Sequence, residues 1–179
     1  MSVRGIHVLG SPVLRERARE IGTPTADTAA FVQDLFDTMR AADGVGLAAN
    51  QVGVAERVAV VDTHDGEPVV LIDPVILERY GEERGEEGCL SIPGPAFYGD
   101  VDRATRIVLE TTTLLGERVR MEVLDHRARA VQHEIDHLDG VLFIDHLSPL
   151  KRRMLLRKWE KHRKGKAGFV QMPTPAGGY

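Results

Sequence analysis

The chain has 179 residues, of which 42% are hydrophobic and 28% charged, and its formal net charge is −4. This length and composition predict one soluble globular domain. No apolar run is long enough to span a bilayer, and the first residues lack the apolar core of a signal peptide, so we expect a cytoplasmic protein with no membrane contact. The single cysteine, Cys89, excludes an intrachain disulfide.

The N-terminal part of the chain predicts helices. Ser11 followed by Pro12 is typical of an N-cap and a first helical position, so we expect a short helix to start there. Residues 25–42 predict a longer helix, because apolar side chains recur at helical spacing along one face. That face carries Phe31, Val32, Leu35, Phe36 and Met39.

The middle of the chain predicts β-strands. Residues 57–62 and 68–74 are apolar and flank an Asp-Gly pair, which is typical of a hairpin turn. Residues 75–84 predict another strand. Residues 106–114 and 117–124 flank a Leu-Gly pair and predict a second hairpin.

The helical period returns near residue 126, and a last helix is expected after Pro149. The order of these elements predicts an α+β fold, with mainly antiparallel sheets around a central helix that carries the HEIDH segment, N-terminal helices and a C-terminal helix. We expect residues 1–164 to form a single domain and residues 165–179, rich in glycine and proline, to form a flexible tail.

The HEIDH segment, residues 133–137, has the spacing of a metal site. On a helix, His137 lies about 40° from His133, and Glu134 about 100° from it, so one face presents both imidazoles and a carboxylate. Apolar residues occupy the opposite face, which is expected to pack on a sheet. HExxH also occurs by chance, and this division into a polar front and an apolar back favours a metal site.

Two histidines leave a catalytic metal short of one protein ligand. Cys89 lies upstream, after a glycine and before a Ser-Ile-Pro segment that is expected to be extended. A lone cysteine is more often a small buried apolar residue than a ligand. The downstream candidates are Asp139, Asp145, His146 and His162.

Three segments occur in a characteristic order: GVGLAANQ at 44–51, EGCLS at 87–91 and QHEIDH at 132–137. Together they resemble the three signature motifs of bacterial peptide deformylase, and the likeness extends over roughly residues 5–150. The resemblance implies a metal-dependent hydrolase. It would remove the formyl group from the N-terminal formyl-methionine of newly synthesised proteins and release formate, by attack of metal-bound hydroxide.

The resemblance also implies roles for single residues. The metal ligands would be Cys89, His133 and His137, and Glu134 would be the general base and acid. Gln51 and the backbone N–H of Leu90 would hold the formyl oxygen as negative charge grows on it. Fe²⁺ is implied as the physiological metal, and Zn²⁺, Ni²⁺ or Co²⁺ also suit a thiolate and two imidazoles. Outside the centre, Glu87 is expected to pair with Arg103.

The same resemblance predicts how a formylated nascent peptide is held. Val45, Gly46 and Gly88 would offer backbone groups to an extended peptide. His126, Arg129 and Ala130 share the ligand face of the helix and would line a pocket for the methionine side chain. His126 stands where the family more often has a bulkier apolar residue, and residues 94–100 do not match the family's best-known members.

The charge is concentrated near the C-terminus. Residues 151–166 hold nine Lys or Arg and one acid, whereas the rest of the chain holds 14 bases and 26 acids. Such a segment is either a solvated helix face or a surface for a polyanion. Deformylases with a helical C-terminal extension are associated with the ribosome, so residues 149–164 are a candidate contact with rRNA.

Two other functions are consistent with parts of the pattern. A zinc metallopeptidase of the HExxH type would take its third ligand from downstream. A metal-stabilised binding module with a basic tail for RNA would have no catalytic activity. The role of Cys89 separates the first alternative from a deformylase, and turnover separates the second.

Overall fold

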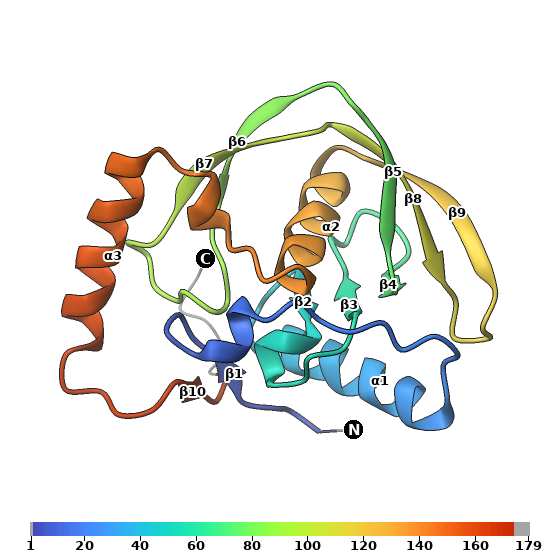
Figure 1. Ribbon diagram of the computed structural model, residues 1–179, viewed down its shortest axis with the longest axis horizontal. Helices are drawn as coiled ribbons and strands as arrows, with labels where there is room; N and C mark the ends of the chain where they lie inside the picture. Colours follow the sequence, from blue (N-terminus) through green and yellow to red (C-terminus); the bar gives the residue numbers. More distant parts are fainter. Residues whose placement is uncertain (1, 174–179) are drawn as a thin grey trace.

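The structure is a computed structural model that describes residues 2–173. This part of the chain contains three α-helices and three short 3₁₀ helices interspersed with strands (Figure 1). The α-helices are α1 (Ala26–Ala41), α2 (Asp125–Leu138) and α3 (Pro149–Arg163), and the 3₁₀ helices are η1 (Pro12–Arg15), η2 (Ala49–Val52) and η3 (Phe143–His146). The predicted helices at the N-terminus, around HEIDH and after Pro149 are therefore all present. No helix within residues 2–173 has the length and apolar character needed to cross a membrane.

Within residues 2–173 the strands form four small sheets, every strand pair in them is antiparallel, and two of the sheets pack against α2. One sheet contains β2 (Gly46–Ala48), β3 (Val58–Val61) and β4 (Val69–Ile72), and a second contains β5 (Val75–Tyr80), β8 (Arg106–Thr112) and β9 (Arg118–Leu124). The two-stranded sheets pair β6 (Glu83–Glu87) with β7 (Gly99–Arg103), and β1 (Ile6–His7) with β10 (Val170–Gln171). The α+β class and the antiparallel pairing match the prediction.

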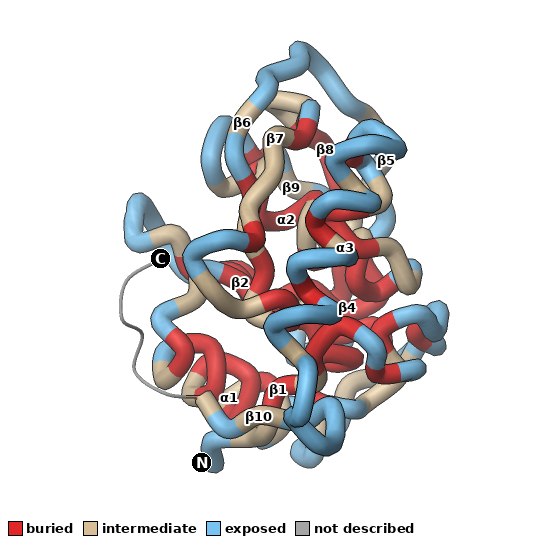
Figure 2. Tube along the Cα trace, turned by 90° about the vertical axis from the view of Figure 1, so that its left-hand side faces the viewer, coloured by how far each residue is buried: buried red, intermediate tan, exposed pale blue. Residues whose placement is uncertain are grey.

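The back of α2 forms the centre of one hydrophobic core. Ala128, Val131, Ile135 and Leu138 are all buried there, against apolar residues of the β2–β3–β4 and β5–β8–β9 sheets. Helix α1 contributes to a separate core that includes other residues of β2 and β3. Figure 2 shows buried residues concentrated along α1 and α2. The apolar stripe predicted for each helix is thus the face that packs.

Helix α2 ends directly after its second histidine. The N–H of Val141 donates to the carbonyl of Asp136 (2.9 Å) and the N–H of Gly140 to that of His137 (3.0 Å). Gly140 has φ +74°, and a Cβ there would lie 2.6 Å from the carbonyl oxygen of Arg15. This pattern is the glycine-dependent Schellman end of a helix. It fixes the last turn of α2 against η1.

Helix α3 begins at Pro149, in agreement with the helix predicted there, and the structure shows Ser148 as its N-cap. It is held to the body through a third core, in which Leu155 and Trp159 are both 5% exposed. The indole N–H of Trp159 also donates to the carbonyl of Leu9 (3.0 Å). The helix is therefore an integral part of the fold and does not extend freely into solvent.

Two local predictions are wrong. The loose tail predicted from Gly165 is contradicted at Val170–Gln171, which pair with Ile6–His7, while the carbonyl of Phe169 accepts from the N–H of Val8 (2.8 Å). Residues 174–179 lie outside the described part of the chain. The segment after Cys89 is a turn rather than extended, because the N–H of Ile92 donates back to the carbonyl of Cys89 (2.8 Å).

Candidate active site

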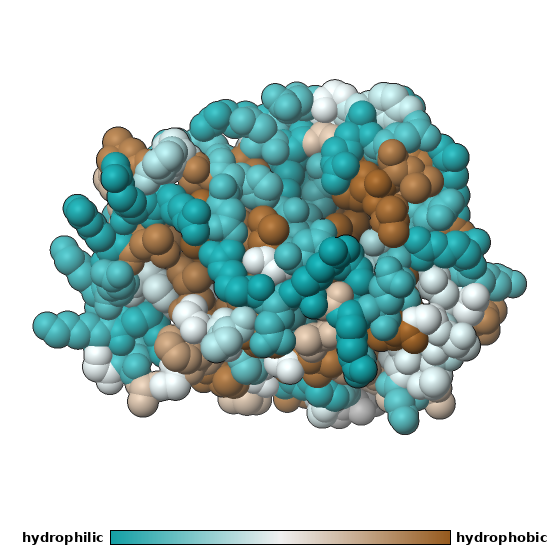
Figure 3. All heavy atoms as spheres, in the orientation of Figure 1, coloured by the Kyte–Doolittle hydropathy of each residue, from teal (hydrophilic) through white to brown (hydrophobic). Residues whose placement is uncertain are grey.

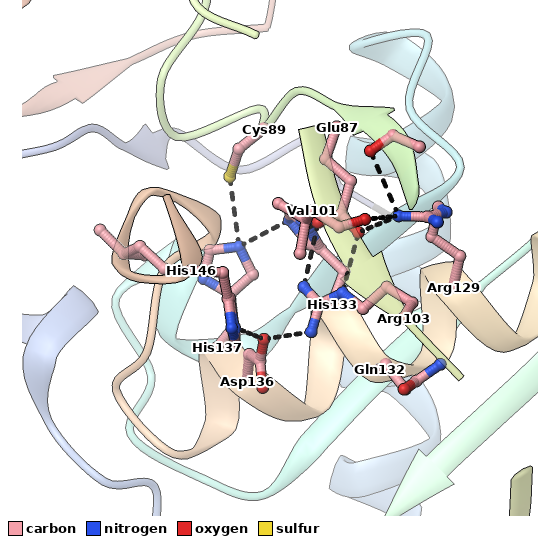
Figure 4. Close-up of polar contacts among 12 residues, drawn as sticks. Glu87, Cys89, Val101, Arg103, Arg129, Gln132, His133, Asp136, His137 and His146 are labelled. Atoms are coloured by element: carbon pink, nitrogen blue, oxygen red, sulfur yellow. Dashed lines mark hydrogen bonds and ion pairs between the residues drawn. The ribbon is translucent and has the colours of Figure 1, made fainter. Parts of the chain in front are cut away.

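Three segments that are far apart in sequence meet at one cavity, and Figure 4 shows two of them, the residues around Cys89 and the polar face of α2. Strand β2 and η2 contribute Gly46 and Gln51, the turn after β6 contributes Cys89 and Leu90, and α2 contributes its polar face. Strand β2 is hydrogen-bonded to β3, and the turn directly follows β6, which is paired with β7. The backbone positions from which these side chains project are therefore fixed. The three motifs identified in the sequence thus form one site.

Cys89, His133 and His137 converge on one point. The Sγ of Cys89 lies 3.2 Å from Nε2 of His137, which lies 3.2 Å from Nε2 of His133. All three ligand atoms lie within 4.8 Å of one another. Metal–sulfur and metal–nitrogen bonds of about 2.0 to 2.3 Å in a tetrahedron place ligand atoms roughly 3.3 to 3.6 Å apart. The spacing and the donor set therefore fit a divalent transition metal.

The downstream candidates for a third ligand are engaged elsewhere. Asp139, Asp145 and His146 bind other side chains, and His162 stacks on an indole. The partners are Arg57 for Asp139 (2.7 Å), Arg152 for Asp145 (3.0 Å), Asp136 for His146 (2.7 Å) and Trp159 for His162 (ring centroids 5.6 Å apart). Cys89 is the residue that completes the cluster.

Glu87 orients His133. Nδ1 of His133 lies 3.0 Å from Oε2 of Glu87, so this nitrogen carries the proton and Nε2 is left free to face Cys89 and His137. Arg103 donates two hydrogen bonds to the same carboxylate (2.8 and 3.0 Å), as the sequence predicts, and Arg129 donates a third (2.9 Å). Burial alone would raise the pKa of Glu87, but the hydrogen bonds from His133 and Arg103 hold it well below its usual range.

The network continues from Arg103 to the surface. Nη1 of Arg103 donates to Oδ2 of Asp136 (2.6 Å), and Nε2 of His146 lies 2.7 Å from the same oxygen. Arg103 is 5% exposed and His146 37%. A continuous chain of polar contacts therefore runs from Glu87 beside the cavity through Arg103 and Asp136 to His146 at the surface.

Glu134 lies beside the ligand cluster and is 4% exposed. Its Oε1 lies so close to β2 that a Cβ on Gly46 would come within 2.3 Å of it, so only glycine leaves room for the carboxylate. Its Oε2 has no hydrogen-bond partner among the described residues. Burial raises the pKa of Glu134 to about 7, a suitable value for a group that exchanges protons near neutral pH.

Gln51 and Leu90 present donors beside Cys89. Oε1 of Gln51 accepts from the N–H of Ala48 (2.9 Å), which turns the Nε2 amino group toward Ser91 Oγ (3.1 Å) and Cys89 Sγ (3.7 Å). The N–H of Leu90 makes no hydrogen bond within the described residues. Two donors thus lie near the cysteine.

A cavity of about 280 Å³ opens in front of these groups. All six residues predicted to bind substrate line it: Val45, Gly46, Gly88, His126, Arg129 and Ala130. The guanidinium of Arg129 donates hydrogen bonds to Glu87 and to backbone carbonyls of β6 and β7. Its role is therefore to stabilise the side of the cavity formed by these strands. His126 is exposed at the rim.

Sequence reasoning gave no role to Tyr98 or Asn50. Tyr98 lines the cavity, and a Cβ on Gly88 would lie 2.5 Å from its ring, so Gly88 is required for this contact. The side-chain amide of Asn50 donates to the carbonyl of His137 and ties η2 to the end of α2. The position of Asn50 directly before Gln51 in the motif was the available sequence signal for the second contact.

A carboxylate of near-neutral pKa beside a Cys-His-His cluster, at the end of a peptide-sized cavity, is the arrangement of a metal-dependent hydrolase. The sequence model of the polypeptide deformylase family matches residues 3–153 of the chain. The chain therefore belongs to the polypeptide deformylase family. Its activity is the removal of the formyl group from the N-terminal methionine of nascent proteins, as the sequence motifs predict.

Individual relatives and solved structures agree. The chain is 44% identical over 170 residues to peptide deformylase 2 of Vibrio cholerae, covering 93% of this chain and 99% of the relative. It is 48% identical over 164 residues to the Alkalilimnicola ehrlichii enzyme, covering 90% and 91%. The Legionella pneumophila peptide deformylase structure has a TM-score of 0.84 at 39% identity, covering 91% and 96%. The Ehrlichia chaffeensis structure in complex with actinonin has a TM-score of 0.84 at 32% identity, covering 93% and 100%.

Proposed function

We propose that Cys89, His133 and His137 hold one divalent metal ion and that Glu134 is the group that moves the proton in deformylation. The observation that carries this proposal is the convergence of three ligand atoms beside a buried carboxylate oxygen that has no other partner. A bound cation supplies a Lewis acid that lowers the pKa of water toward neutrality.

Glu134 performs two proton transfers in this proposal. Its carboxylate takes a proton from the attacking water, and the water oxygen forms a bond to the formyl carbon. The same carboxyl group then gives that proton to the amine nitrogen as the C–N bond breaks. The products are formate and a free N-terminal amine. A pKa near 7 allows Glu134 to serve in both directions.

Gln51 and Leu90 stabilise the charge that develops on the formyl oxygen. The Gln51 amide and the Leu90 N–H are neutral donors in a buried site, where such groups act more strongly than in water. The hydrogen bond from Ala48 to Gln51 keeps the amino end of the amide aimed at the site. The amide is thus preorganised before substrate arrives.

The formylated peptide binds in the cavity in an extended form. Strand β2 pairs only with β3 within its sheet, so its other edge is available to a peptide beside Val45 and Gly46. Gly88 offers backbone groups from the facing wall. His126, Arg129 and Ala130 border the pocket for the methionine side chain. Backbone recognition reads little sequence, which suits an enzyme that acts on many nascent chains in the cytoplasm.

Fe²⁺ is the proposed physiological metal, with Zn²⁺, Ni²⁺ or Co²⁺ as ions that the same donors accept. The test is to purify the protein without oxygen, reload the metal-free form with each ion, and measure formate release from formyl-Met-Ala. We expect the iron form to be highly active and to lose activity in air, because a thiolate beside iron is prone to oxidation. A metal-loaded protein that releases no formate would overturn the proposed function.

We further propose that α3, within a catalytic domain of residues 1–164, contacts rRNA. Arg153, Arg157 and Lys161 are exposed and have no ion-pair partner within residues 2–173. Hydrophilic side chains project over α3 on the left-hand face in Figure 3. Removing α3 would expose the core around Trp159, so the sharper test reverses these three charges. We expect weaker ribosome co-sedimentation at low salt with unchanged formyl-Met-Ala turnover, and unchanged co-sedimentation would rule the contact out.

A further inference from the structure

A second cavity adjoins the methionine pocket. We propose that it is a subsite for a downstream residue of the formylated peptide, with a preference for an acidic over a basic side chain at that position. This inference rests on the proposed function, because it extends the path of the same substrate. It assigns to α3 a role in substrate selection that is separate from its proposed contact with rRNA.

The second cavity has a volume of about 230 Å³ and shares Glu86 and Tyr98 with the first. Both residues therefore stand between the two spaces. An extended peptide advances about 3.3 Å per residue. A chain that follows β6 out of the first cavity thus meets the second a few residues after the methionine.

Helix α3 forms the far wall of this cavity with a single face. Lys151, Met154, Leu155 and Lys158 all line it. Their spacing is i, i+3, i+4 and i+7, which places all four side chains on one stripe of a helix. Leu155 is buried, and Met154 is 54% exposed although it is apolar. The stripe offers apolar contact at its centre and a cation at each end.

The charges of the cavity favour an acidic side chain at its α3 wall. Lys151 lies 3.4 Å from Asp100 and is already paired. Lys158 has no ion-pair partner among residues 2–173. Glu86 and Asp100 also line the cavity, and Asp100 is the partner of Lys151, so the acidic preference applies only to a residue that has passed Glu86 and lies beside Lys158. A free ammonium beside an apolar floor is the complement of a carboxylate on a short aliphatic stem.

The two walls are held in a fixed relation to each other. The ring of Phe97, next to Tyr98, meets the ring of Trp159 edge-on at 5.3 Å. A Cβ on Gly99 would lie 2.7 Å from Leu147, so the loop packs closely against the segment that leads into α3. Edge-on aromatic contacts of this kind stabilise the packing beyond the burial of the rings. The cavity is therefore a built feature of the fold.

The test uses a series of formylated peptides, formyl-Met followed by alanines, with a single Glu or Lys at position 3, 4, 5 or 6. We expect one position at which kcat/KM for the Glu peptide exceeds that for the Lys peptide by about 2- to 5-fold, the range of an exposed ion pair. The ratio should fall as salt is added, because exposed charges are screened. Equal kcat/KM for Glu and Lys at every position would overturn the proposal.

Lys158→Glu and Arg157→Glu provide a matched pair of variants. Each changes the charge of α3 equally, but only Lys158 lines the cavity. We expect Lys158→Glu to reverse the Glu-to-Lys ratio at the responsive position and Arg157→Glu to leave it unchanged. The same shift in both variants would show a general effect of charge and overturn the subsite. Formyl-Met-Ala does not reach the second cavity, so failure to release formate from it would instead overturn the proposed function.

Discussion

Helices α2 and α3 both carry polar residues on one face and apolar residues on another, yet the two polar faces behave differently. The front of α2 is enclosed, and Glu134 and His137 on it are 4% and 1% exposed. The basic face of α3 is open to water, and Arg153 and Arg157 on it have no partner in residues 2–173. Enclosure requires each polar group to have a partner or a ligand, whereas water supplies partners to any exposed charge.

This difference in exposure determines how large an effect each substitution is expected to have. A change at the enclosed face removes a member of a network that links Cys89, His133, Glu87 and Arg103. A change at the open face removes one screened charge. We make four predictions, which are ordered from residues of the enclosed site to a residue on the exposed surface.

Cys89→Ala is expected to have the largest effect. It removes one of three ligands, so the purified variant should contain almost no metal and release no measurable formate. Metal content by elemental analysis and formate release measure this, with far-UV circular dichroism as the check on folding. A variant that keeps its metal would point to a different third ligand, as in a zinc metallopeptidase.

Glu134→Gln is expected to lower kcat by about 10² to 10⁴-fold, the range for loss of a general acid–base group, while the metal content stays the same. The amide keeps the shape of the side chain but cannot accept the proton. Glu122→Gln, which lies on exposed β9, is the matched control and should keep full activity. Equal activity in the two variants would show that Glu134 is not the proton carrier.

Glu87→Gln is expected to weaken metal binding by about 10- to 100-fold, because the carboxylate orients His133 and is not itself a ligand. It also leaves Arg103 and Arg129 with a neutral partner in a buried place. Metal affinity from competition with a chelator is the measurement. Glu78→Gln changes an exposed pair with Arg120 and should leave the affinity unaltered.

Asp100→Asn is expected to have the smallest effect on stability. It breaks the pair with Lys151, in which the two side chains are 46% and 53% exposed. Pairs of this kind contribute about 0 to 1 kcal/mol. Chemical denaturation should therefore show a change of less than about 1 kcal/mol in the free energy of unfolding. A larger loss would mean that the open face of α3 is as strongly coupled to the fold as α2 is.

The sequence was sufficient to predict the elements whose patterns are strong. The apolar stripes of α1 and α2 and the two apolar hairpins were all recognised, because each buries a regular set of side chains. Strands β6 and β7 were missed, since Glu83–Glu87 contains no apolar residue and Gly99–Arg103 only one. Strand β7 does alternate, with Val101 and Arg103 buried, but a buried arginine reads as polar in a sequence.

The candidate site, too, was predicted where its residues form a regular sequence pattern. Its central residues lie in motifs with fixed spacing, so the sequence places them together. Tyr98 was missed because it lies in a loop with no regular pattern, and the α3 wall was missed because its lysines look like an ordinary solvated helix face in the sequence. The β1–β10 pairing was also missed, because two-residue strands carry no period that a sequence can show.

That pairing has a consequence for how the chain is made. Strand β1 pairs only with β10 among the described strands, so this sheet cannot form until residue 171 has been synthesised. The proposed metal ligands all precede residue 138, and η3 ends at His146. Cys89 packs in the same core as Leu155 and Trp159 of α3, so the surroundings of the reaction centre are complete only after α3 has been translated, and the last strand then joins the two ends of the molecule.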